Sequence, residues 1–157
     1  MKKTKLIIAA AIVGLISASS LTSCKKEEGC TDPNANNYST NAEEDDGSCT
    51  YPTINLNATG DGDVTGGGGS ASSTNEWTNS QSKAELNMDI TAASGGRFQI
   101  IVKDSDGTEV INETLTVGIG DDSKNICSAS GTPGTWTVTV SLTDFSGDGS
   151  FSLSQGC

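Results

Sequence analysis

The segment Lys83–Ala92, with the sequence KAELNMDITA, decides the fold class of this 157-residue chain. Its even-numbered positions are all apolar and its odd-numbered positions are all polar. A strict period of two is typical of a β-strand with one face in a protein core and the other in water. The segment therefore predicts a half-buried strand of an antiparallel sheet.

The same period of two recurs on both sides of this segment, and no window of useful length has the 3.6-residue period of a helix. Further strands are expected at Ile54–Ala58, Phe98–Val102, Val110–Val117, Trp136–Leu142 and Phe151–Leu153. Six to eight short antiparallel strands within residues 52–157 predict an all-β domain, a β-sandwich or jelly roll.

Polar and glycine-rich stretches predict the connections between these strands. Gly60–Ser70 contains four consecutive glycines and is interpreted as an inter-strand loop, with a linker as the alternative. Asp104–Gly107 predicts a hairpin turn, Gly118–Lys124 a polar loop and Asp144–Gly149 a further turn.

Composition excludes several classes of function. The chain has 9 Lys and Arg against 20 Asp and Glu, a net charge of −11 and no histidine. Such a charge cannot neutralise phosphates, so nucleic-acid binding is excluded. Without histidine there is no Ser-His-Asp or Cys-His nucleophile and no His-ligated metal site.

Residues 1–23 have the pattern of a secretory signal peptide: a lysine-containing start, an apolar run over Leu6–Ile16, and small residues before Cys24. The apolar run has 11 residues, against the ~20 that a membrane-spanning helix needs. The end, Leu21–Cys24, resembles a bacterial lipobox, which implies that Cys24 is the lipid attachment site. An ordinary signal peptide with a chance cysteine is the alternative.

Residues 24–28 would then be a lipidated tether. Lys25–Glu28 resembles the surface-export signal of Bacteroidota-type lipoproteins, which implies an outer-membrane protein exposed at the cell surface. A solvated linker explains the same four residues. Removal of residues 1–23 takes away three lysines and leaves 6 basic and 20 acidic side chains, a net charge of −14.

Four further cysteines remain in this exported chain, and an even number in an oxidising compartment predicts disulfides. Three connectivities exist, of which locality in the sequence favours Cys30–Cys49 and Cys127–Cys157. A four-thiolate zinc site is the rival, but the chain has no C-x-x-C pair.

Residues 29–51 resemble a short Cys-bounded module that recurs in surface proteins of the same bacterial group. The matching anchors are GCTDP at Gly29–Pro33, Asn37-Tyr38, DDGSC at Asp45–Cys49, and Tyr51. We expect a disulfide-stapled set of turns in which Tyr38, Ala35 and Ala42 form a small core.

Calcium is the one metal that the oxygen-rich turns of this module suit, and Asp32, Asp45 and Asp46 are its candidate ligands. The spacing is not that of an EF-hand loop, and ordinary turn chemistry explains the same residues. No other cofactor is expected.

The C-terminal part is similar to the β-sandwich of the bacterial pre-peptidase C-terminal type. GTWTV at Gly134–Val138 and GDGSFSL at Gly147–Leu153 carry the resemblance. It implies an accessory domain of a secreted protein, a class suspected of binding glycans or polymers. No peptidase domain accompanies it in this chain.

Together these patterns predict a lipid-anchored cell-surface binding module, with an extracellular glycan or polymer as its ligand. Trp77 lies in a polar stretch and is the candidate stacking residue, whereas Trp136 lies on an apolar stripe and is expected in the core. We do not expect an enzyme, because a compact sandwich of this size rarely has a deep cleft. The alternative is a structural or adhesive envelope scaffold that contacts a larger protein partner.

Overall fold

The computed structural model describes residues 25–116 and 120–157. The predicted signal peptide, 1–23, and the predicted lipid attachment site, Cys24, lie outside the described residues. Within the described part, no helix could span a membrane.

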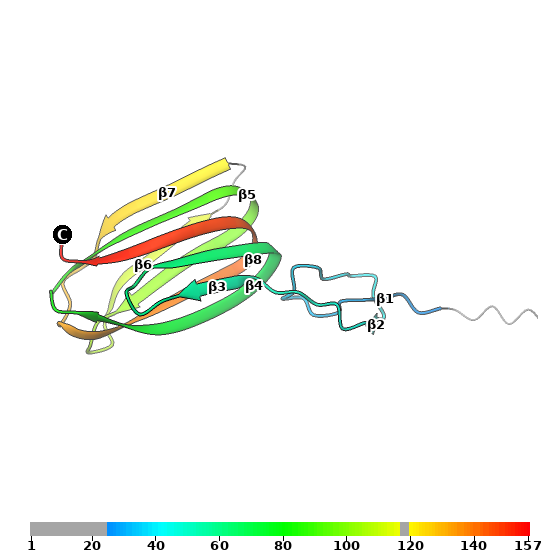
Figure 1. Ribbon diagram of the computed structural model, residues 1–157, viewed down its shortest axis with the longest axis horizontal. Coiled ribbons are helices and arrows are strands. Elements are labelled where there is room, and N and C mark those ends of the chain that lie inside the picture. Colours follow the sequence, from blue (N-terminus) through cyan, green and yellow to red (C-terminus); the bar gives the residue numbers. More distant parts are fainter. Residues whose placement is uncertain (1–24, 117–119) are drawn as a thin grey trace, which may run out of the picture.

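The described residues form eight β-strands, which confirms the all-β fold class (Figure 1). Two short parallel strands belong to the Cys-bounded module, residues 29–51 with the preceding Glu28, and six antiparallel strands form the sandwich. The strands are β1 (Glu28–Gly29), β2 (Glu44–Asp45), β3 (Thr53–Leu56), β4 (Gly62–Asn79), β5 (Ala84–Lys103), β6 (Glu109–Thr116), β7 (Gly120–Cys127) and β8 (Gly134–Gln155).

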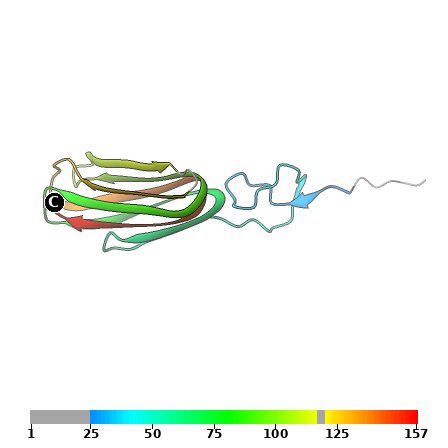
Figure 2. The same ribbon diagram turned by 90° about the horizontal axis from the view of Figure 1, so that it is seen from above.

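Three of the sandwich strands are long, and each contributes to both layers. Layer 1 contains β3, the first half of β4, the second half of β8, the first half of β5, and β7. Layer 2 contains the second half of β4, the first half of β8, the second half of β5, and β6. Figure 2 shows the two layers edge-on, with the bends at the end next to the module.

The bends fall where the pairing register shifts: between Gly67 and Ala71 in β4, between Thr91 and Arg97 in β5, and opposite them near Asp144 in β8. Gly96 has a φ of 94° and Asp144 a φ of 49°, which turn the backbone where β5 crosses β8. A β-bulge bends a strand and increases its twist, so the ladder continues around the corner.

These bends correct three of the predictions. Gly60–Ser70 is not a loop, because Gly62–Ser70 is the first part of β4 and pairs with β8. Residues 120–124 of the predicted polar loop belong to β7, and the predicted turn 144–149 is part of β8. The six strands agree with the predicted number but are not all short.

The core lies between the layers and is built by the inward side of each period-two pattern. Trp136, Phe98 and Phe145 are its largest fully buried side chains, and Trp136 is therefore a core residue as predicted. The Phe98 ring packs against Phe145 and Phe151 with centroids 6.3 and 6.0 Å away. At one side of the sandwich, Lys124 of β7 joins the layers by an ion pair to Glu113 of β6, at 2.8 Å.

Both disulfides have the pairing that sequence locality favoured. Cys30 bonds to Cys49 inside the module, and Cys127 bonds to Cys157. The second bond ties the C-terminal end of β8 to the end of β7, on the far side of β5. All four thiols are thereby used, so the rival four-thiolate zinc site is not formed.

The module packs on the bend of β4. The side-chain oxygen of Asn36 accepts hydrogen bonds from the amides of Gly67 and Gly69, at 2.8 and 3.3 Å, and the carbonyl of Asn34 accepts one from Ser70, at 2.9 Å. A Cβ at position 69 would lie 2.9 Å from the backbone of Ala35 and Asn36, so glycine permits this close approach.

The predicted small core of the module is only partly present. Ala35 is buried and Ala42 is half-buried, but Tyr38 is 45% exposed. With 23 residues, the module has too few apolar side chains to cover a tyrosine ring, and its order comes from the disulfide and from turn hydrogen bonds.

Replacing the glycine at the β5 bend should unfold the sandwich more readily than replacing a turn glycine. At Gly96→Ala the new Cβ would lie 2.6 Å from backbone atoms of Thr143 and Asp144, at a positive φ. We expect a loss of about 3 kcal/mol in the free energy of unfolding, measured by urea denaturation.

Gly107→Ala is the matched control. Its φ is 82°, but nothing lies within 4 Å of the added Cβ, so only the backbone cost of about 1–2 kcal/mol applies. Equal losses for the two variants would contradict the close approach of β5 and β8 at the bend.

Candidate functional site

The outward side chains of layer 1 form a polar surface, which we call the acidic face. The period of two places these side chains on one side, because their neighbours along each strand point into the core. The face includes Asn55 (β3), Asp63 and Thr65 (β4), Asp148, Ser150 and Ser152 (β8), Glu85, Asn87, Asp89 and Thr91 (β5), and Ser123 and Asn125 (β7).

Two hollows lie along the acidic face, one over β3, β4 and β8 and the other over β5 and β7. The first has a volume of about 450 Å³ and is lined by side chains that include Asn55, Asp63 and Ser150. The second, of about 330 Å³, is lined by Asp89, Thr91, Asp122, Ser123 and Ile90. The strand register places Asp63, Ser150, Asp89 and Ser123 in one row across the sheet, so the row joins the two hollows.

Hydrogen bonds within the face fix some of its polar groups. Ser150 Oγ donates to Asp89 Oδ1 at 2.6 Å, and Thr65 Oγ1 donates to Asp148 Oδ1 at 3.1 Å. Gly62 lines the first hollow, and only glycine fits at this position, because an added Cβ would lie 2.5 Å from the Phe151 ring.

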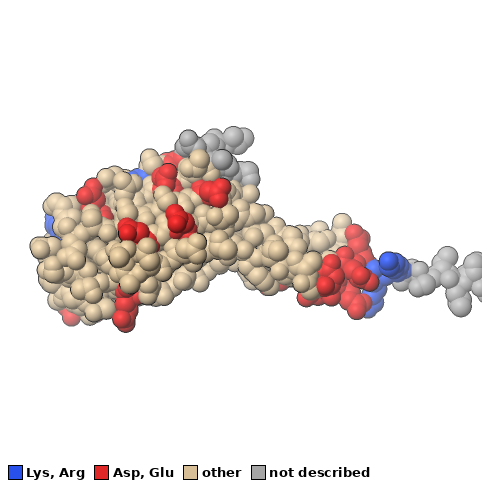
Figure 3. Space-filling model, viewed as in Figure 1, with Lys and Arg blue, Asp and Glu red and all other residues tan. Residues whose placement is uncertain are grey.

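The electrostatics of this face are one-sided. In the view of Figure 3, which looks onto layer 1, acidic side chains are scattered over the sandwich and basic ones are scarce. The six basic residues of the described part lie elsewhere or point away from the row. They are Lys25 and Lys26 before the module, Lys83 in the turn before β5, Arg97 and Lys103 on layer 2, and Lys124, whose ammonium binds Glu113.

Layer 2 has a different outer surface, which we call the hydroxyl face. Neighbouring strands pair Ser72 with Ser141 and Thr74 with Thr139, each with hydroxyl oxygens 3.0 Å apart. Because these hydroxyls bind one another, fewer of their donors and acceptors remain for a ligand. A hollow of about 160 Å³ beside Arg97 is smaller than either hollow of the acidic face.

The prediction that Trp77 is an exposed stacking residue is wrong. Trp77 is 5% exposed, and its ring packs edge-to-face on Trp136 with centroids 5.9 Å apart and an interplanar angle of 83°. The period of two at Trp77 was not visible in the sequence, because the next inward residue, Asn79, is polar. Asn79 is fully buried, and its side-chain amide donates a hydrogen bond to the carbonyl of Lys83. Trp77 is therefore part of the core.

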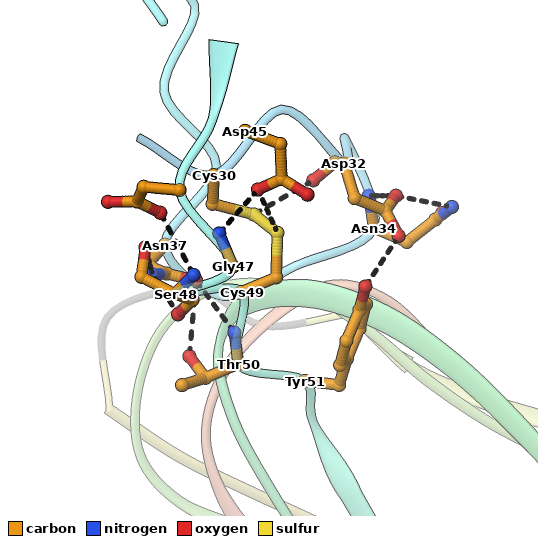
Figure 4. The surroundings of a disulfide bond; sticks show 11 residues. Cys30, Asp32, Asn34, Asn37, Asp45, Gly47, Ser48, Cys49, Thr50 and Tyr51 are labelled. Atoms are coloured by element: carbon orange, nitrogen blue, oxygen red, sulfur yellow. Dashed lines mark hydrogen bonds between the residues drawn. A yellow bond between two sulfur atoms is a disulfide. The ribbon is translucent and has the colours of Figure 1, made fainter. Parts of the chain in front are cut away.

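The exposed rings of the described residues both belong to the module or its boundary: Tyr38 and Tyr51. Tyr51 is 49% exposed, and its hydroxyl donates to Asp32 Oδ2 at 2.8 Å, as Figure 4 shows. This hydrogen bond raises the pKa of Tyr51. The amide of Asn34, together with the Tyr51 hydroxyl, lowers the pKa of Asp32.

The three predicted calcium ligands serve turns instead. Asp32 accepts from the amide of Asn34 at 2.9 Å, Asp45 from Gly47 at 3.2 Å, and Asp46 from Ser48 at 2.9 Å. The hydrogen bonds from Ser48 also lower the pKa of Asp46. In residues 25–116 and 120–157, no group of three acidic or cysteine side chains is arranged to hold a metal ion.

One buried carboxylate, Asp104, has a role that the sequence did not predict. The sequence places it in a hairpin turn, and its Oδ1 accepts hydrogen bonds from the backbone amides of Asp106 and Thr108, at 3.0 and 2.8 Å. Its Oδ2 also accepts from the amide of Thr132 at 2.8 Å, which joins the turn to the loop before β8. The hydrogen bond from the Thr132 amide is the main reason that the pKa of Asp104 is lowered.

No family model matches the chain, and no curated protein matches it significantly. Among solved structures, the chain is similar to TmCBM61, solved in complex with β-1,4-galactotriose, with a TM-score of 0.41 and 14% sequence identity. The similarity covers 67% of this chain and 69% of that one. Nothing about the ligand of this chain follows from so low a similarity.

The buried position of Trp77 predicts a structural effect for its replacement. Trp77→Ala should lower the free energy of unfolding by about 3–5 kcal/mol, because it opens a cavity beside Trp136. Thr78→Ala, at the exposed neighbouring position, should change it by about 0.5 kcal/mol or less. Urea denaturation of both variants measures this, and a fully stable Trp77→Ala variant would contradict the core assignment.

Proposed function

We propose that this chain is a lipid-anchored cell-surface module that binds an uncharged extracellular glycan or a similar polymer through the acidic face. The observation that carries the proposal is the row Asp63–Ser150–Asp89–Ser123, which joins two hollows across β8. The row supplies carboxylate and hydroxyl groups side by side, and Asn55 of β3, which pairs with Asp63, adds an amide at its end. Polymer hydroxyl groups are complementary to all three.

The dimensions of the row suit an elongated ligand. Extended by Asn55 of β3, which pairs with Asp63, the row crosses five strands, and because strands lie ~4.8 Å apart this extended row is roughly 19 Å long. A ligand lying across the strands would meet both hollows in succession. Such a surface fits a polymer segment better than a small compact molecule.

The charge of the face selects against anionic ligands. Carboxylates of Asp63, Asp89, Asp148 and Glu85 lie on it, whereas the two basic residues of β5, Arg97 and Lys103, lie on layer 2. Nucleic acids, polyuronates and phosphorylated polymers would be repelled. A ligand rich in hydroxyl groups can donate to these carboxylates without carrying charge.

The absence of an exposed aromatic ring from the acidic face limits the affinity of a single site. Hydrogen bonds to solvated groups exchange with water and contribute ~1 kcal/mol each. Many copies on one cell surface, each contacting a repeating polymer, would raise the overall avidity. A lipid anchor at Cys24 provides that arrangement, and the module would hold the sandwich away from the membrane.

A binding assay with two matched substitutions tests the face. Ser150→Tyr would place a large ring between the hollows, whereas Thr137→Tyr places the same ring on the hydroxyl face of the same strand. For the mature chain, residues 24–157 without lipid, we expect saturable binding to an uncharged polysaccharide in a glycan screen. Ser150→Tyr should weaken it at least tenfold, and Thr137→Tyr should leave it unchanged.

Other outcomes of the same assay would contradict the proposal. Loss of binding in Tyr51→Ala with full binding in Ser150→Tyr would move the site to the exposed ring of the module. Preference for anionic polymers would contradict the electrostatic argument. No binding across the panel would favour the alternative function, an adhesive or structural scaffold with a protein partner.

The lipid anchor has its own test. Expressed with its signal sequence in a bacterium that processes lipoproteins, the chain should be membrane-bound, and Cys24→Ala should release it into a soluble fraction. Because the module and the sandwich do not include Cys24, the variant should keep the stability of the parent chain. A Cys24→Ala variant that stays membrane-bound would overturn the anchor.

A further inference from the structure

The second half of β4 forms an open edge of layer 2. β8 pairs with β4 along its whole length, but β3 pairs only with Gly62–Thr65, so the stretch after the bend has one neighbouring strand. Such an edge presents unpaired backbone N–H and C=O groups. The chain itself occupies both ends: Asn34 accepts from the amide of Ser70, and Gln155 Nε2 donates to the carbonyl of Thr78 at 3.1 Å.

Between these ends lies the open stretch Ala71–Trp77, with the sequence ASSTNEW. It has no lysine and no proline, which are the residues that usually protect sheet edges from pairing. Glu76 is its one charged residue. By contrast, β6 carries Glu109 and Glu113, β7 carries acids and Lys124, and β3 is only four residues long.

We propose that the open stretch of β4 pairs with the same stretch of a second copy of this chain, antiparallel and about a two-fold axis at Thr74. In this register all seven residues overlap, and Thr74 faces Thr74 of the second copy. Glu76 of each copy faces Ser72 of the other, so the two Glu76 carboxylates do not lie opposite one another. Such an isologous contact closes at a dimer, and layer 2 would continue from one copy into the next.

The direction of β4 gives this dimer a particular shape. After the bend, β4 runs from the module towards the opposite end of the sandwich, where the C-terminus lies (Figures 1 and 2). An antiparallel partner therefore has its module at the other end of the dimer. With the proposed anchor at Cys24, the two lipids would leave in opposite directions. The dimer would then bridge two membrane surfaces, and this part of the inference rests on the proposed anchor.

The affinity of one such contact should be low, because seven paired residues bury a small area. Each mature copy also carries a net charge of −14, so the copies repel one another at low salt. Raising the ionic strength screens this repulsion and should strengthen the dimer. Many copies on facing membranes would add their contacts.

A charge substitution at Ser72 tests the register. Ser72→Glu would oppose two like charges across the axis, because the carboxylate introduced in one copy would face Glu76 of the other. Ser72→Lys would instead create two opposite-charge pairs. For the lipid-free mature chain, sedimentation equilibrium should show a monomer–dimer equilibrium. We expect about a fivefold weaker dimer for Ser72→Glu and about a fivefold tighter one for Ser72→Lys.

A cysteine pair provides a second readout of the axis. Cα atoms of directly paired residues in an antiparallel ladder lie ~5.5 Å apart, a separation that a disulfide spans. Thr74→Cys should therefore form a cross-linked dimer under mild oxidation. Thr139→Cys, on the neighbouring interior strand of the same face, should not.

The bridging geometry is tested with the lipidated protein on vesicles of phosphatidylcholine. We expect vesicle clustering that Ser72→Lys increases and Ser72→Glu decreases. The interface would be overturned if the chain is monomeric at every concentration, or if neither charge variant changes the dissociation constant of the dimer. A charge-sensitive dimer without clustering would overturn the bridging arrangement. The glycan assay tests layer 1 and the dimer assay tests the edge of layer 2. A negative result in one assay therefore leaves the result of the other unaffected.

Discussion

The structure depends on the bending of three strands at one end of the sandwich. β4, β5 and β8 each continue from layer 1 into layer 2, so the two layers are one folded sheet rather than two sheets joined by loops. The bends bring backbone against backbone: a Cβ at Gly96 would collide with Thr143 and Asp144, and one at Gly66 with the carbonyl of Phe145. Side chains larger than hydrogen would separate the strands at these crossings.

The bends also determine where the rest of the molecule lies. The module packs on the glycines of the β4 bend through Asn36, and the turns and the Cys127–Cys157 bond gather at the opposite end. Because each long strand changes layers, its two halves present different outer surfaces. Carboxylates gather on layer 1 and paired hydroxyls on layer 2, so the proposed ligand surface and the proposed dimer edge belong to different layers.

The sequence predicted those features that local patterns encode. The apolar alternation in β5 and β8 identified most of the core, including Leu86, Ile100 and Trp136. Short separations in the sequence were enough to pair the cysteines. The Gly60–Ser70 stretch was misread because its strand character comes from β8, more than 70 residues away in the chain, and not from its own side chains.

The candidate site was less accessible to sequence reasoning. Trp77 is surrounded by polar residues in the sequence, but the bend changes which residues meet, and its ring turns towards Trp136. The row Asp63–Ser150–Asp89–Ser123 joins four strands, and only their register brings these residues together. Register between distant strands has no local signal in a single sequence.

Amide hydrogen exchange resolved by residue tests the account most directly, because it distinguishes a bent strand from a loop at Gly60–Ser70. Gly67 and Gly69, whose amides bind Asn36, and the β8-facing amides of Gly62–Asn79 should exchange far more slowly than a random coil. The amides of Ser82 and Lys83, exposed residues in the turn before β5, should exchange fast. Random-coil rates throughout Gly60–Ser70 would contradict the continuous strand, and with it the folded sheet and the docking of the module.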